Sequence, residues 1–143
     1  MPKLLLFAPC EKVLTDQQTN TVSLIGILQE IHFRWPPGTP IQPNALLPIN
    51  WSVIAVWQEE EQADAGVEFE QRLTLENPAG TMLFSNDVKW TFDTPSHRIV
   101  ATIPGLPISW RKLTLKLFYR VVAARDWHEA ASFPMAIVQE LIQ

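Results

Sequence analysis

The sequence predicts an all-β fold, a single domain over residues 1–143 built as an antiparallel Greek-key sandwich of about eight strands. Two observations carry this prediction. Apolar residues recur at every second position within short segments, and turn-forming residues separate those segments. Alternation of this kind places apolar side chains on one face of a strand, whereas a helix would scatter them around its circumference. A length of 143 residues is usual for a single domain.

Four segments show the strand pattern most clearly. In the best of them, Leu113, Leu115 and Leu117 alternate with polar residues such as Thr114 and Lys116. Because each strand has one apolar and one polar face, we expect antiparallel sheets with one face packed on the core and the other exposed to solvent. The other three segments are residues 49–57, 67–75 and 82–92.

The remaining strands have a less regular pattern. Residues 4–7, and residues 25–28 within the segment 22–33, are apolar on both alternating positions, and residues 98–103 and 131–138 complete the count of about eight. The segment 22–33 is long for one strand. We therefore expect Gly26 to mark a bulge or bend that lets this segment serve two sheets.

Turn residues agree with this division. Asn77-Pro78-Ala79-Gly80 lies between two alternating segments and predicts a hairpin, since proline and glycine occupy positions that tight turns favour. Residues 34–48 include five prolines, which exclude a helix or a sheet interior. This stretch predicts a stiff crossover between the two sheets, as Greek-key sandwiches require.

The charge is modest but unevenly distributed. A formal net charge of −4 argues against a nucleic-acid partner or an anionic membrane surface, both of which favour a strong positive excess. Acidic residues gather in residues 59–70, and basic residues dominate residues 98–125. Two interpretations stay open: these are solvated faces, or acidic and basic strands pair as neighbours or recruit a charged partner.

Cys10 is the single cysteine, so no intramolecular disulfide can form, which fits a reducing compartment. The apolar run at residues 4–8 is shorter than the roughly 7–15 residues of a secretory signal. No other segment approaches the roughly 20 apolar residues of a membrane span. We therefore expect a cytoplasmic protein that does not enter a membrane.

The motifs that carry catalysis or bind metals are missing from the sequence. His32, His97 and His128 are isolated from one another, which argues against a zinc site. Glu68 and Glu70 share one strand face at a separation of about 7 Å, which a glycosidase could use, but such pairs are usually solvated. We expect a protein that is not an enzyme and needs no cofactor or metal.

The six tryptophans divide into two groups. Three of them (Trp51, Trp57 and Trp90) occupy the same alternating positions as the apolar residues of their strands and are predicted to lie in the core. The other three (Trp35, Trp110 and Trp127) fall in connecting segments.

Counting strands places Trp35 and Trp110 at the same end of the sandwich, with Trp127 at the opposite end. Arg34 precedes Trp35 and Arg111 follows Trp110. Arginine and tryptophan are typical of binding hot spots, so these four residues are the candidate binding site, which we call the Arg/Trp end. The alternative is that the rings close the open end of the core with arginine stacked on them.

Several motifs resemble a family of small bacterial proteins classed only as a domain of unknown function. They are the pair Cys10-Glu11, the strand at residues 23–28 and the hairpin at residues 77–80. The family has an aromatic residue where this chain has Leu28, and a glycine before its last Tyr-containing strand that is missing before Phe118-Tyr119. The resemblance implies an immunoglobulin-like or C2-like sandwich and no particular function.

Two functions follow as hypotheses. The first is a non-enzymatic interaction domain that binds a protein partner, or a second copy of itself, through a sheet edge or the Arg/Trp end. The alternative is a module that binds a small ligand or carbohydrate on its loop tryptophans.

Overall fold

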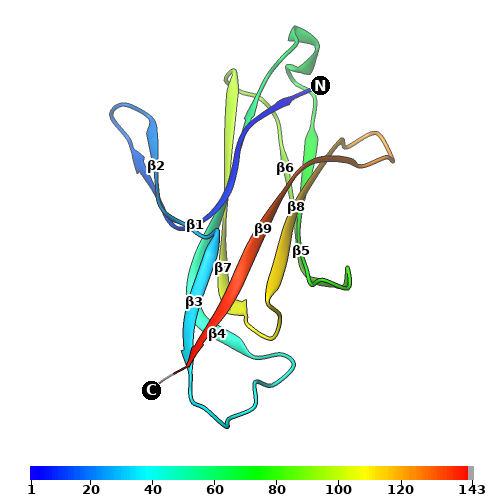
Figure 1. Cartoon of the computed structure of the whole chain (residues 1–143). Coiled ribbons are helices and arrows are strands. Elements are labelled where there is room, and N and C mark those ends of the chain that lie inside the picture. Colours follow the sequence, from blue (N-terminus) through cyan, green and yellow to red (C-terminus); the bar gives the residue numbers. More distant parts are fainter. Residues whose placement is uncertain (142–143) are drawn as a thin grey trace.

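In the computed structural model, which describes residues 1–141, nine strands form two facing sheets (Figure 1). A short 3₁₀ helix, η1 (Gln62–Asp64), is the one helical element among those residues. The strands are β1 (Lys3–Asp16), β2 (Thr21–Ile27), β3 (Glu30–Trp35), β4 (Leu46–Gln58), β5 (Phe69–Glu76), β6 (Met82–Trp90), β7 (Ser96–Pro107), β8 (Lys112–Val121) and β9 (His128–Leu141).

Sheet A has the order β2-β1-β4-β7, and sheet B has the order β3-β9-β8-β5-β6. The all-β class and the two-sheet, sandwich-like arrangement agree with the prediction. The expectation of about eight antiparallel strands needs correction, because there are nine and β3 runs parallel to β9. Strand pairs of this kind join residues more than 100 positions apart, which local patterns do not reveal.

The extra strand arises where the long apolar segment 22–33 divides. Gly26 has a φ of 67°, a left-handed conformation that glycine adopts without steric cost. After Ile27 the chain leaves sheet A, with the Leu28 amide donating to the Pro9 carbonyl at 3.0 Å, and β3 joins sheet B. Gly26 thus has an unusual backbone conformation, but it stays within β2, and the predicted strand divides at residues 28–29 into β2 and β3.

The predicted hairpin and crossover are both present. Between β5 and β6, the Asn77 side-chain oxygen accepts hydrogen bonds from the amides of Ala79 and Thr81 at 3.0 and 2.9 Å, while Gly80 has a φ of 80°. This is the local chemistry that favours asparagine in turns. The proline-containing connection after β3 carries the chain from sheet B to sheet A.

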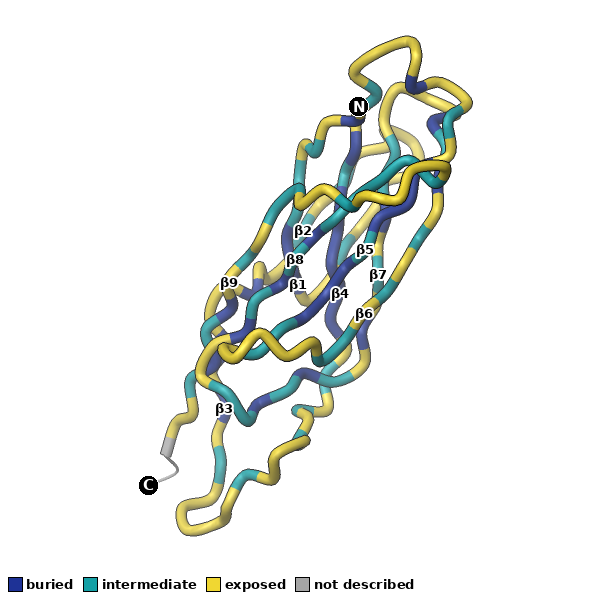
Figure 2. Tube along the Cα trace, turned by 90° about the vertical axis from the view of Figure 1, so that its right-hand side faces the viewer, coloured by how far each residue is buried: buried dark blue, intermediate teal, exposed yellow. Residues whose placement is uncertain are grey.

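The core lies between the sheets, and Figure 2 shows its buried segments along the middle of the sandwich with exposed connections at the ends. Trp51, Trp57 and Trp90 are 1%, 0% and 4% exposed, as their positions on the apolar faces of the strands predicted. The Trp57 indole N–H donates to the Gln71 side-chain oxygen at 2.9 Å. This bond joins β4 to β5, and hence one sheet to the other.

The β1–β2 hairpin bends away from the body and runs back beside sheet A (Figure 1). Its tip is attached to the far strand of that sheet, where the Arg98 guanidinium of β7 donates to the Asn20 carbonyl at 3.1 Å. Ile54 alternates with the core residues of β4, so its side chain points outward, yet it is 0% exposed. We infer that the hairpin covers the middle of this outer face.

Candidate functional site

The Arg/Trp end is formed where three segments meet at one end of the sandwich. Residues 108–111, between β7 and β8, contact the connection between β3 and β4 through two hydrogen bonds. The Ile108 amide donates to the Ala45 carbonyl at 3.3 Å, and the Ser109 hydroxyl donates to the Gln42 carbonyl at 2.7 Å. The Ile137 amide of β9 donates to the Arg111 carbonyl at 2.8 Å. Hydrogen bonds to main-chain carbonyls thus hold this end together.

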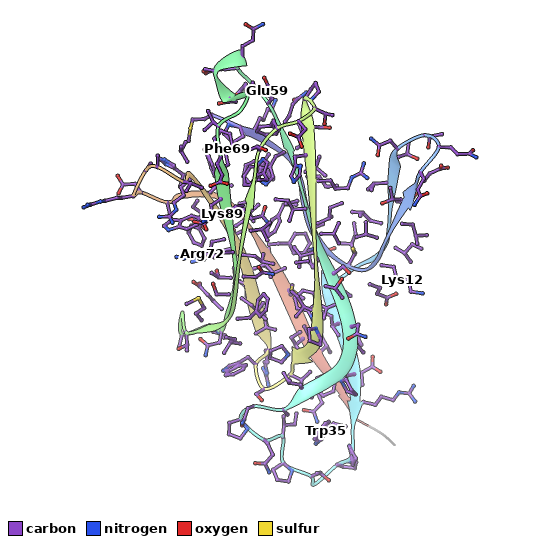
Figure 3. All side chains as sticks on the ribbon, turned by 180° about the vertical axis from the view of Figure 1, so that it is seen from behind. Lys12, Trp35, Glu59, Phe69, Arg72 and Lys89 are labelled. Carbon is purple, nitrogen blue, oxygen red and sulfur yellow. The ribbon has the colours of Figure 1, made fainter. Side chains whose placement is uncertain are left out.

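Trp35 and Trp110 both lie at this end, but their roles differ. The Trp35 ring packs edge-to-face against Phe33, with ring centroids 6.2 Å apart, and its indole N–H donates to the Thr39 carbonyl at 2.9 Å. Figure 3 shows Trp35 beside the connection that follows it. Trp35 therefore fastens the proline-rich connection to β3.

Arg34 is separated from the other candidate residues. It alternates with Trp35 along β3 and therefore projects from the opposite face. Its side chain is 76% exposed, and its Nε lies 3.9 Å from a Glu140 carboxylate oxygen. Arg34 and Arg111 do not form one cluster.

A cavity of about 600 Å³ opens at this end, and two of the four candidate residues, Trp110 and Arg111, line it. Its wall combines aliphatic, aromatic and polar side chains, so it can hold an apolar group and orient a polar one. The other lining residues were not predicted from the sequence: Phe33, Ile41, Ile108, Ser109, Ile137, Val138 and Gln139. They come from four separate segments, which the pairing of β3 with β9 and the hydrogen bonds of residues 108–111 bring together.

A second cluster, which the sequence argument also missed, surrounds Trp127. The guanidinium carbons of Arg72 and Arg120 each lie 4.4 Å from the centroid of the Trp127 ring, within cation–π distance. Arg72 donates two hydrogen bonds of 2.9 Å to the Asp87 carboxylate, and Figure 3 shows its place on the side of the molecule away from the β1–β2 hairpin.

The other arginine of this cluster is also occupied. Arg120 donates to one Glu70 oxygen at 3.0 and 2.7 Å. Because both arginines have carboxylate partners, the Trp127 cluster is a satisfied structural network rather than an open site.

The carboxylate pair considered for catalysis does not act as a pair. Glu70 is 7% exposed and bonded to Arg120, whereas Glu68 is exposed to solvent. A second ion pair, Lys116 to Glu76 at 3.0 Å, joins the same two strands. The interpretation that acidic and basic strands are neighbours is therefore correct for β5 and β8.

The titratable groups outside these clusters are dispersed. Hydrogen bonds to Glu30 and Glu140 raise the pKa of His32, and burial lowers the pKa of His97. Burial raises the pKa of the Cys10 thiol. Among residues 1–141, no three His, Cys, Asp or Glu side chains are grouped so that they could hold a metal ion.

Comparisons with known proteins leave the site to be argued from its geometry. No family model matches the chain, and a search of curated proteins found no match. Within the part of the chain that the structure describes, no helix is long and apolar enough to cross a membrane.

Proposed function

We propose that this chain is a non-catalytic binding domain, immunoglobulin-like in strand order, that holds a protein partner at the Arg/Trp end. The order β1-β4-β7 in sheet A and β9-β8-β5-β6 in sheet B supports the fold assignment. These orders correspond to strands A, B and E and to strands G, F, C and C′ of an immunoglobulin domain. Such sandwiches commonly present binding residues at one end.

The cavity beside Trp110 and Arg111 is the observation that carries the proposal. Trp110 is half-buried and supplies aromatic surface, and Arg111 is the one charged side chain among the residues that line the cavity. Tryptophan and arginine dominate the binding energy of protein interfaces. The partner that fits is a segment with an apolar side chain, which enters the cavity, and a nearby carboxylate, which pairs with Arg111.

The non-catalytic part of the proposal is supported by the engagement of Glu70 with Arg120, which removes the one carboxylate pair considered for hydrolysis. A cytoplasmic location is also proposed. Its support is Cys10, a single cysteine that is buried and free.

A small-ligand or carbohydrate module is the second candidate. The cavity volume of about 600 Å³ favours it, since small-molecule pockets span roughly 300–1,000 Å³. Against it, Trp110 is the one tryptophan among the described residues that line the cavity. Carbohydrate platforms usually need exposed rings, so we rank this function second.

Selection of peptides displayed on phage against the purified protein tests the first candidate. We expect the enriched peptides to combine an aromatic or aliphatic residue with a neighbouring Asp or Glu. Their affinity should fall about tenfold or more for Trp110→Ala and Arg111→Glu, because hot-spot substitutions cost about 2 kcal/mol. Fluorescence anisotropy of labelled peptides measures this loss.

Arg125→Glu is the matched control, because Arg125 is exposed in the connection at the opposite end. It introduces the same charge change and should bind the peptides as wild type does. Peptides that lack acidic residues, or that bind the Arg111→Glu protein equally well, would contradict the proposal. A titration with mono- and disaccharides that shifts the NMR signals of the Trp110 indole would instead support the second candidate.

A further inference from the structure

β9 continues past the point where β8 begins, so its last residues are paired on one side only. The pairing of β8 with β9 starts at Lys112 and Ala136, whereas β9 stays paired with β3 as far as Leu141 (Figure 1). The cavity of about 600 Å³ is lined by residues 108–111, which lead into β8, and by residues 137–139 of β9. Within the part of the chain that the structure describes, an open strand position therefore adjoins the cavity.

The main chain of Gln139 faces this open strand position. The Ala136 amide donates to the Gln29 carbonyl, on the β3 side, at 2.9 Å. The next amide, that of Ile137, donates to the Arg111 carbonyl on the opposite side at 2.8 Å. Because bonding groups alternate between the two sides of a strand, the N–H and C=O of Gln139 point the same way as those of Ile137. Among residues 1–141 they have no main-chain partner there, so an extended segment beside β9 can bond to both.

The charge of Arg111 is available to a ligand. Among the described residues, no carboxylate forms an ion pair with Arg111, whereas Arg72 and Arg120 each have one. Glu140, near the end of β9, is bonded to His32 at 2.8 Å and alternates to the other face of the strand. An acidic group that enters the cavity can therefore pair with Arg111.

The direction of the strands decides which end of a bound segment meets Arg111. A segment in line with β8 runs antiparallel to β9, and Arg111 and Lys112 already occupy the continuation of that line. The last residue that fits lies opposite Gln139, with its side chain on the inner face that Phe33 and Ile137 share. Its carboxylate then lies beside Arg111. A segment of the reverse direction would bring a positively charged amino terminus to the arginine instead.

We propose that the Arg/Trp end captures the C-terminal segment of a partner protein as a short strand against β9. This inference rests on the proposed function and specifies its partner. The terminal residue is apolar, and its side chain enters the cavity beside Phe33, Ile41 and Ile108. Its N–H donates to the Gln139 carbonyl, while its carboxylate accepts from the Gln139 amide and the Arg111 guanidinium. Strand addition and capture of a terminal carboxylate are both known modes of peptide recognition.

The probes are fluorescein-labelled peptides of sequence GSTTVT followed by valine, leucine or phenylalanine, each made as a free acid and as a C-terminal amide. For the best of the three, we expect the acid to bind the full chain at least about tenfold more tightly than the amide, which lacks the charge. Arg111→Gln should remove this preference. Lys112→Gln is the matched control and should keep it, because Lys112 is exposed and alternates with the inward Leu113.

Gln139→Pro tests the main-chain bonds, because proline removes the N–H that the carboxylate accepts from and is tolerated at strand edges. This variant should bind the free acid about tenfold or more weakly. Gln139→Ala keeps the N–H and should bind as wild type does. In the wild type, the free acid should also slow hydrogen exchange of the Gln139 amide, which NMR measures without any variant.

Equal affinities of acid and amide throughout the series would overturn the inference. If the peptides selected on phage still required Trp110 and Arg111, the proposed function would stand, with an internal acidic segment as the partner. If those peptides failed too, both proposals would be wrong. Self-association by light scattering that the free acid reverses would also overturn the inference, since a second copy of the chain would then be the occupant.

Discussion

At the scale of single residues, the stacked tryptophans Trp57 and Trp90 differ in whether their indole N–H groups have hydrogen-bond partners. Their ring centroids lie 5.3 Å apart, and both rings are buried. Trp57 donates its N–H to Gln71, whereas the N–H of Trp90 has no partner among the described residues. A buried donor without a partner costs free energy, so the two rings do not contribute equally to stability.

Replacing each tryptophan by phenylalanine tests this difference, because the two substitutions remove the same atoms. Trp57→Phe leaves the Gln71 oxygen without its donor, while Trp90→Phe removes a donor that had no acceptor. We expect Trp57→Phe to lower the free energy of unfolding by about 1–2 kcal/mol more than Trp90→Phe does. Urea unfolding followed by circular dichroism measures both, and equal losses would contradict the assignment.

His97 makes stability depend on pH. Burial against Trp90 lowers its pKa below 6.5, although the charge of Asp93 opposes the shift. The unfolded chain therefore binds a proton on His97 at a higher pH than the folded chain does. The stability that neutral, buried His97 contributes is fully present above pH 6.5. It is lost as the pH falls toward the lowered pKa of His97.

We expect the melting temperature of the wild type to fall between pH 6.5 and 5, above the range where most carboxylates titrate. His97→Gln should flatten this part of the profile. His128→Gln is the control, because His128 is exposed on β9. A profile that His97→Gln leaves unchanged would assign the acid sensitivity to another group.

At the scale of the elements, ion pairs connect β5 and β8 across the outer face of sheet B. The side chain of Glu70 is 9% exposed and that of Arg120 is 27% exposed, so this pair is only weakly screened by water. Removing one partner from such a pair leaves a nearly buried charge uncompensated. Removing both leaves no buried charge.

Arg120→Met should therefore destabilise the protein by about 2–3 kcal/mol, since hydrogen bonds to charged groups contribute about that much. The double variant Glu70→Leu with Arg120→Met should recover most of the loss. Arg125→Met, at an exposed position nearby in sequence, should cost little. A double variant no more stable than Arg120→Met alone would show that lost contacts with Trp127, rather than the stranded carboxylate, cause the effect.

The elements that the sequence could predict are those fixed by local chemistry. Leu113, Leu115 and Leu117 occupy one face of a strand because alternation leaves them no other common face, and all three are 0% exposed. The Asn77 hairpin follows from its own hydrogen bonds. The separation of β2 from β3 was only partly foreseen, because Gly26 indicates a bend but not which sheet the chain enters next.

At the scale of the whole molecule, the candidate site depends on pairings that the sequence does not encode locally. Strand counting correctly placed Trp35 and Trp110 at one end, since consecutive strands alternate in direction. It did not separate Arg34 from Arg111, because that requires knowing which face of β3 Arg34 occupies. Nor could it show the cavity, whose Phe33 and Gln139 lie on strands that are remote in sequence.

The β1–β2 hairpin is the part of the molecule that should be removable without loss of the core. Residues 11–27 contribute no member to the core cluster, and the hairpin tip is attached to the body by the Arg98–Asn20 bond. Val13 and Leu24 are register partners. Replacing residues 14–23 by Asn-Gly would therefore join them through a two-residue turn that hairpins favour.

The shortened protein should keep the near-ultraviolet circular dichroism of its buried tryptophans while exposing the outer face of sheet A. Ile54→Cys in a Cys10→Ala background places a thiol on that face. It should react with a thiol reagent slowly beneath the full hairpin and about tenfold faster beneath the shortened one, because labelling follows exposure of the thiol. Equal labelling rates would mean that sheet A itself buries Ile54. Loss of the tryptophan signal would mean that the hairpin stabilises the core.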